Sequence, residues 1–185
     1  MRKLVIVLAT LFVATLANAV EIAGVTIAEK ASVGGQELVL NGAGMRTKLF
    51  VKVYVGSLYL PAKAAELAGV LGAAPRRIQL NVMRTLSADQ LIDALVDGLK
   101  ANNSPEELAA VSKEMVELVA TLKALNDVKE KDVVTFDFVD GTTKIALNGT
   151  PKSSIGGDAF NRALTKIWLG EHPVQADLKK KMLGG

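Results

Sequence analysis

A twenty-residue stretch, residues 41–60 with the sequence NGAGMRTKLFVKVYVGSLYL, most constrains the fold of this chain. Its second part, Leu49–Leu60, is rich in aliphatic and aromatic residues and predicts a long β-strand. Gly42 and Gly44 precede that run, and Arg46 follows the glycines closely. The pattern places a fixed cation near the start of a strand, with flexible backbone beside it.

Arg46 is the strongest candidate for a binding residue in the chain. Its guanidinium is a planar fork of donors that suits a carboxylate or an enolate-like oxyanion. The neighbouring glycines would let a ligand approach the backbone. The alternative is a surface arginine or a structural ion pair.

Alternation along the predicted strand divides its side chains between two faces. Tyr54 lies eight residues after Arg46, so an unbroken strand puts both on one face. There the phenol can donate to an anion that Arg46 holds, unless a bulge changes the parity. A tyrosine packed at the sheet edge is the alternative. The predicted core face carries Leu49, Val51, Val53, Val55 and Tyr59, and the other face carries Arg46, Lys48, Phe50, Lys52 and Tyr54.

Turn signals and capping boxes divide the rest of the chain into short elements. Gly34-Gly35 and Asp140-Gly141 each predict a hairpin. Ser87 and Ser104 each open a capping box, and Pro105 occupies a first helical position. These signals predict one α+β domain, an antiparallel sheet with helices mostly on one face. The expected strands are Val25–Val33, Gln36–Leu40, Arg76–Arg84, Asp132–Val139 and Thr142–Leu147, and the expected helices are 64–71, two helices after Ser87 and Ser104, Ala159–Leu169 capped by Asp158, and Val174–Leu183.

Residues 1–19 have the features of a secretory signal peptide. Arg2 and Lys3 form a basic n-region, Leu4–Leu16 is an apolar h-region, and Ala17-Asn18-Ala19 is a cleavage site. The apolar run is short for a membrane span. We therefore expect a single domain over residues 20–185, periplasmic or secreted, with no stable membrane span after the signal is removed.

Composition excludes several classes of function. The chain has no cysteine, which rules out disulfides and thiolate chemistry. Once Arg2 and Lys3 are removed, 20 basic side chains face 19 acidic ones, and no basic patch alternates with aromatic residues, so no nucleic-acid partner is expected. Lys179-Lys180-Lys181 suits the end of a helix, the alternative being a membrane or polyanion patch.

Sites for metals and cofactors are not indicated. His172 is the one histidine of the chain, which makes an ordinary multi-histidine metal site impossible. We interpret it as a loop or cap residue, with a general base as the alternative. The sequence predicts no cofactor and names no protein partner.

The 41–60 stretch resembles the chalcone isomerase-like family. The shared elements are a GAG-x-R step, here residues 42–46, a following strand that contains Phe50-Val51-Lys52, and Tyr59-Leu60. The segment Ile167–Val174, IWLGEHPV, is similar to another family region. The resemblance implies an open-faced β-sandwich, a large antiparallel sheet covered by a helical layer with a ligand cleft between them.

The resemblance also implies site residues. In the plant enzymes, which close a chalcone into a flavanone, the arginine matching Arg46 stabilises the developing anion. Other members bind fatty acids through that arginine and a tyrosine on the following strand, here Tyr54. Other catalytic polar positions of the enzymes fall on or near Tyr54, Gln90, Asp93, Asp97 and Ile167, which are different residues here.

Three functional hypotheses follow. The first is binding of a small amphipathic anion, a fatty acid or a phenolic compound, by Arg46 and Tyr54. The second is an isomerase or lyase acting on an enone-type substrate, with Arg46 as its catalytic residue. The third is a structural or interaction protein whose cleft is vestigial.

Overall fold

Seven antiparallel strands form one curled sheet in the computed structural model, which describes residues 19–185. Each strand pairs with its neighbour in the sequence, so the sheet is a meander without crossovers. A separate hairpin, β1 (Ala19–Ile22) with β2 (Val25–Ala28), precedes it. The sheet order is β3 (Lys30–Val33), β4 (Gln36–Lys48), β5 (Val51–Leu60), β6 (Arg76–Val82), β7 (Val133–Val139), β8 (Thr142–Leu147) and β9 (Thr150–Gly156).

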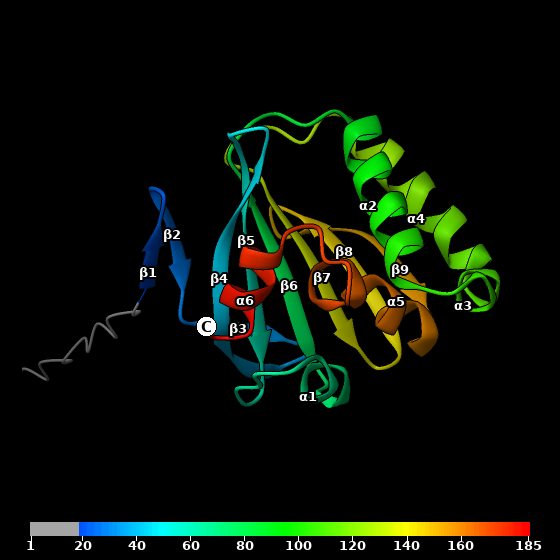
Figure 1. Ribbon diagram of the computed structural model, residues 1–185, viewed down its shortest axis with the longest axis horizontal. Helices are drawn as coiled ribbons and strands as arrows, with labels where there is room; N and C mark the ends of the chain where they lie inside the picture. The colour runs from blue at the N-terminus through cyan, green and yellow to red at the C-terminus, as the bar shows by residue number, and fades with distance from the viewer. Residues whose placement is uncertain (1–18) are drawn as a thin grey trace, which may run out of the picture.

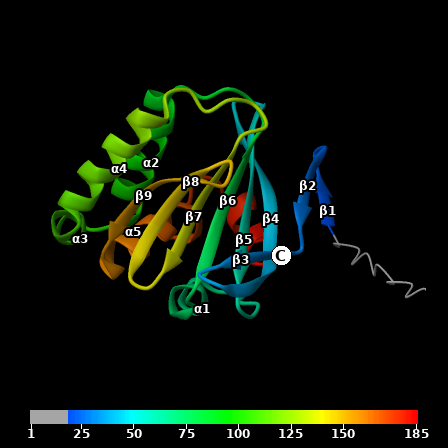
Figure 2. The same ribbon diagram turned by 180° about the vertical axis from the view of Figure 1, so that it is seen from behind.

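Helices cover one face of this sheet, as Figure 1 shows from the helical side and Figure 2 from behind. The main core lies between the two layers, and Ile78, Leu80 and Val82 of β6 point into it. The predicted α+β fold, an antiparallel sheet under a helical layer, is confirmed. The helices are α1 (Leu67–Gly72), α2 (Ala88–Asn102), α3 (Pro105–Ala110), α4 (Ser112–Leu125), α5 (Asp158–Leu169) and α6 (Ala176–Met182).

A second, smaller core lies on the opposite face of β4 and β5. Val55 and Tyr59 of β5 pack there with Ile27 of β2 and Leu38 of β4. The Tyr59 hydroxyl donates to the Ala28 carbonyl at 3.0 Å, which ties the N-terminal hairpin to the sheet. Both faces of β5 are therefore buried over most of its length.

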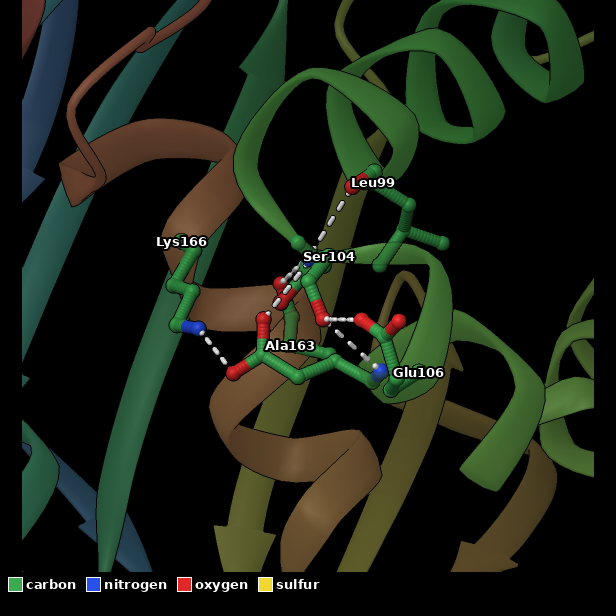
Figure 3. Close-up of polar contacts among 7 residues, drawn as sticks. Leu99, Ser104, Glu106, Ala163 and Lys166 are labelled. Atoms are coloured by element: carbon green, nitrogen blue, oxygen red, sulfur yellow. Dashed lines mark hydrogen bonds and ion pairs between the residues drawn. The ribbon is translucent and has the colours of Figure 1, made fainter.

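Both predicted capping boxes are present. Ser104 Oγ accepts from the Glu107 amide at 3.2 Å, and Glu107 accepts from the Ser104 amide at 2.9 Å. The same Glu107 carboxylate pairs with Lys166 of α5 at 2.7 Å, so the cap also joins α3 to α5. Figure 3 shows Lys166 beside the cap at Ser104. The prediction of a single helix after Ser104 is wrong. The helix is interrupted at Val111, which separates α3 from α4.

Arg76 fixes α5 to the sheet from within the core. It is 4% exposed, and its guanidinium donates to the Asn161 carbonyl at 3.3 Å and to Thr165 Oγ1 at 3.2 Å. Its guanidinium carbon also lies 4.5 Å from the centre of the Phe138 ring. Burial lowers the pKa of Arg76 to about 10. These contacts position the helix whose other end reaches the cleft described below.

Other boundaries differ from the expectations in informative ways. Gly34-Gly35 does form the predicted hairpin, but Glu29 divides the expected preceding strand into β2 and β3. The α5 helix is capped by Gly157 without a side-chain hydrogen bond, so Asp158 is its first residue rather than its cap. The predicted signal segment lies outside the described residues, apart from Ala19. Within residues 19–185, no helix has the length and apolar character needed to cross a membrane.

Candidate functional site

A cleft of about 580 Å³ opens between the sheet and the helical layer, beside the turn that joins β4 to β5. Its volume lies within the range of small-molecule sites in proteins, roughly 300–1,000 Å³. Strands β4, β5 and β6 form one wall, α2 forms the other, and α5 with the loop after it closes the inner end. Its lining includes Arg46, Lys48, Leu49, Val53, Tyr54, Arg84, Gln90, Asp93, Asp97, Ile167, Trp168 and His172.

Arg46 of β4 and Tyr54 of β5 are directly paired on adjacent antiparallel strands, and both line the cleft. The register shifts immediately after this pair, since Thr47 pairs with Lys52 and leaves Val53 without a partner. A bulge of this kind bends a strand and re-aims its side chains. As a result Val53 and Tyr54, although consecutive, both line the cleft.

The predicted juxtaposition of Arg46 and Tyr54 therefore exists, but the strand geometry behind that prediction is wrong. Leu49 and Phe50 form the turn between β4 and β5, with φ of 48° and 65°. Arg46 accordingly lies near the end of one strand, and Tyr54 lies on the next. Val55 and Tyr59 face the smaller core, so the expected single aliphatic face does not exist either.

The glycines before Arg46 serve a different purpose from the one predicted. A Cβ atom on Gly42 would lie 2.0 Å from the Lys181 carbonyl oxygen, and one on Gly44 would lie 2.8 Å from Lys181 Cβ. The space above both glycines is thus filled by α6, not by a ligand. Their lack of side chains lets this helix pack directly on β4.

Packing of α6 on β4 brings Gln175 to Arg46. Gln175 Oε1 accepts from Arg46 Nη1 at 3.3 Å and from the Thr47 amide at 2.9 Å. Arg46 Nη1 also donates to the Thr47 carbonyl. Among the ion pairs of residues 19–185, none involves Arg46, so its charge is held by neutral acceptors. The guanidinium keeps the capacity to pair with an anion in the cleft.

Tyr54 is held from the other side by Trp168 of α5. The indole N–H of Trp168 donates to the Tyr54 hydroxyl oxygen at 3.0 Å, and both side chains are buried. Burial raises the pKa of Tyr54 to about 12, although the Trp168 hydrogen bond and the Arg46 charge both lower it. Because Trp168 supplies the donor of this contact, the phenolic proton of Tyr54 can be donated to a ligand.

The wall of the cleft formed by α2 carries negative charge, opposite in sign to that of Arg46 on the sheet wall. Asp93 and Asp97 are exposed on α2 and line the cleft, as does Gln90. Lys48 and Arg84 line the sheet side together with Arg46. The cleft therefore has a cationic sheet wall and an anionic helix wall, so the head group of a bound anion should lie against the sheet.

His172 lies in the loop between α5 and α6, as expected, but it also lines the cleft. Asn102 fixes its backbone, accepting from the His172 amide at 2.9 Å and donating to its carbonyl at 2.7 Å. In the described part of the chain, no group of three or more histidine, cysteine or acidic side chains is arranged to hold a metal ion.

Two residues that hold the Arg46–Tyr54 pair were not identified from the sequence, Trp168 and Gln175. The Trp168 indole offered a clue, because a buried Trp N–H usually needs an acceptor. A single amide side chain such as Gln175 gives no comparable indication of its partner.

The fold and this cleft define a class of protein, an open-faced β-sandwich with a ligand-sized cleft under its helical layer. The sequence model of the chalcone isomerase-like family matches residues 19–184, and the chain belongs to that family.

Comparison with solved structures supports the same fold. The chain resembles the crystal structure of a fatty-acid-binding protein from Arabidopsis thaliana, with a TM-score of 0.68 and 14% sequence identity. The match covers 90% of this chain and 96% of the plant protein. A comparison with curated proteins found no match.

Proposed function

We propose that this protein binds a small amphipathic anion, a fatty acid or a phenolic compound, in the cleft between the sheet and α2. The observation that carries the proposal is the Arg46–Tyr54 pair, a cation and a phenol donor side by side at one wall of a cleft of about 580 Å³. Arg46 would hold the anionic head group by a bidentate contact, and Tyr54 would donate a third hydrogen bond. The fatty-acid-binding protein of the same fold supports this ligand class.

Isothermal titration of the purified protein with long-chain fatty acids tests the proposal. Arg46→Ala should weaken binding by roughly 2–4 kcal/mol, because the head group loses its charged partner. Arg46→Lys should recover part of this loss, since lysine keeps the charge without the planar fork. Arg162→Ala, an exposed arginine of α5 away from the cleft, is the matched control and should bind as wild type. Equal affinity of Arg46→Ala and wild type would show that Arg46 is not the anchor.

Catalysis on an enone-type substrate is the second candidate. The observation in its favour is that Asp93, Asp97 and His172 place titratable groups in the cleft that Arg46 lines. The positions that match or lie near the catalytic polar positions of the plant enzymes also line the cleft. However, they hold different side chains in this protein. We therefore expect no stereoselective cyclisation of a trihydroxychalcone. Absorbance and chiral analysis of the product decide the question, and turnover near that of a plant enzyme would favour the catalytic role.

We also propose that the protein acts in the periplasm or outside the cell, after cleavage before Val20. The support is the n-region, h-region and cleavage site within residues 1–19. N-terminal sequencing of exported protein checks this, and an intact Met1 in that fraction would contradict it. Native mass spectrometry of the same sample would show whether a ligand is retained, and its mass.

A further inference from the structure

The turn between β4 and β5 carries the most exposed large apolar side chains of residues 19–185. Leu49 is 85% exposed and Phe50 is fully exposed, at 103%. Both residues have positive φ, which favours glycine or asparagine and is costly for bulky side chains. Neither side chain packs in a core. Folding therefore does not account for the apolar residues at this turn.

Basic side chains flank this turn on both strands. Lys48 and Lys52 are exposed on either side of it, and no acidic residue occurs between Met45 and Leu60. The Met83 amide donates to the Val53 carbonyl at 2.9 Å, which holds the loop after β6, with its exposed Arg84, beside the same hairpin. We call residues 48–52 the hairpin tip. Two exposed apolar side chains, Leu49 and Phe50, thus lie between exposed basic side chains.

The hairpin tip also stands at the mouth of the cleft. Lys48, Leu49 and Val51 contribute to the cleft lining, as does Arg84, whereas Phe50 does not. Figure 1 shows the hairpin reaching the upper end of the molecule, where the chain runs from β6 to α2. Anything that the tip contacts is therefore next to the cleft opening.

We propose that the hairpin tip docks on an anionic phospholipid bilayer, with Phe50 and Leu49 inserted at the interface and Lys48 and Lys52 against lipid phosphates. Weak apolar insertion combined with basic side chains is the two-part arrangement by which peripheral proteins bind membranes. A protein partner is disfavoured because a stable interface buries about 800 Å² on each side. The tip offers little more than two side chains. Membrane docking goes beyond the proposed function and does not depend on whether the cleft binds a ligand.

Flotation with phospholipid vesicles tests this docking without any cleft ligand. Exported protein with a verified N-terminus is mixed with vesicles of phosphatidylglycerol and phosphatidylcholine in equal parts, or of phosphatidylcholine alone. Phe50→Asn removes the apolar contact and suits the positive φ at this position, so it should fold at least as well as wild type. Val116→Gln is the matched control, because Val116 is another exposed apolar residue, 70% exposed on α4.

Wild type should bind the anionic vesicles more tightly than the neutral ones. Phe50→Asn should lower the partition coefficient roughly tenfold, because one aromatic side chain no longer enters the interface. Lys52→Gln should lower it roughly fivefold and reduce its salt dependence, and Val116→Gln should leave it unchanged. Fatty-acid affinity of Phe50→Asn in solution should equal that of wild type, so the two proposals can fail separately.

Three results would overturn the docking proposal. The first is a Phe50→Asn variant that floats as wild type does. The second is wild type that fails to bind anionic vesicles or binds neutral ones equally well. The third is a wild-type dimer in solution that Phe50→Asn converts to a monomer, which would make a second copy of this chain the occupant of the tip.

Discussion

Trp168 donates its indole N–H to the hydroxyl oxygen of Tyr54 at 3.0 Å, from a helix to a strand 114 residues earlier in the chain. This contact orients the phenol and leaves its proton available to the cleft. Trp168 is itself fixed by packing, since the centre of its ring lies 5.7 Å from the centre of the Phe136 ring. The position of this cleft-lining hydroxyl therefore depends on the core behind it.

Replacement of Tyr54 by phenylalanine should affect both stability and binding. The buried Trp168 N–H would lose its acceptor, which costs about 1–3 kcal/mol of unfolding free energy. Fatty-acid binding should weaken by about 0.5–1.5 kcal/mol, as expected for one neutral hydrogen bond. Tyr59→Phe is the matched control, because its hydroxyl bonds the Ala28 carbonyl on the other face of the sheet. It should lose stability but keep wild-type affinity; if both variants bind equally, Tyr54 is purely structural.

The two tyrosines should lose their contribution to stability at alkaline pH. The folded state raises the pKa of Tyr54 to about 12 and also raises that of Tyr59, in each case mainly through burial. Their contribution to the free energy of unfolding is therefore constant below the ordinary tyrosine pKa of 10.0, and it falls as pH rises from there towards the folded value. For Tyr54 the slope is at most about 1.4 kcal/mol per pH unit.

Phenolate absorbance during a pH titration measures this effect. The chain has only two tyrosines, so little phenolate should be seen in the folded protein at pH 10.0. Phenolate and loss of circular dichroism should then appear together at higher pH. Ionisation of either tyrosine near its ordinary pKa in folded protein would show that its side chain is more accessible than the structure indicates.

Neutralisation of the helical wall should strengthen anion binding. Asp93→Asn removes a negative charge that faces the cationic sheet wall, and the gain should be about 0.3–1 kcal/mol at low salt because the carboxylate is exposed. Higher ionic strength should reduce this gain. Asp89→Asn changes an exposed acid of the same helix that does not line the cleft, and it should not alter affinity. A loss of affinity in Asp93→Asn would instead mean that Asp93 accepts a hydrogen bond from the ligand, as a phenolic hydroxyl would allow.

Alanine at Gly42 should destabilise the protein by at least about 2 kcal/mol, because its Cβ would collide with the backbone of α6. Ligand binding should weaken as well, since displaced α6 no longer brings Gln175 to Arg46. Gly72→Ala is the control, because nothing lies within 4 Å of a Cβ at that helical position, and it should be neutral or stabilising. Urea unfolding measures both variants. A stable Gly42→Ala protein with impaired binding would restore the idea that the glycines admit a ligand.

The sequence by itself determined the features that depend on near neighbours. Ser87 and Ser104 cap helices because their partners lie three residues away. Gly34-Gly35 turns the chain, and the alternation of Ile78, Leu80 and Val82 buries one face of β6, for equally local reasons. The family and fold followed from short motifs of this kind, and so did the choice of Arg46 and Tyr54 as candidates.

The tertiary structure alone decided how the site is assembled. The two-residue turn at Leu49 and Phe50, with the bulge at Val53, set which side chains face the cleft. Gln175 reaches Arg46 across 129 residues because α6 packs on two glycines of β4. A strand pattern has a period of two residues, so one turn or bulge reverses every assignment beyond it. Contacts between distant side chains depend on the packing of whole elements, which no local pattern contains.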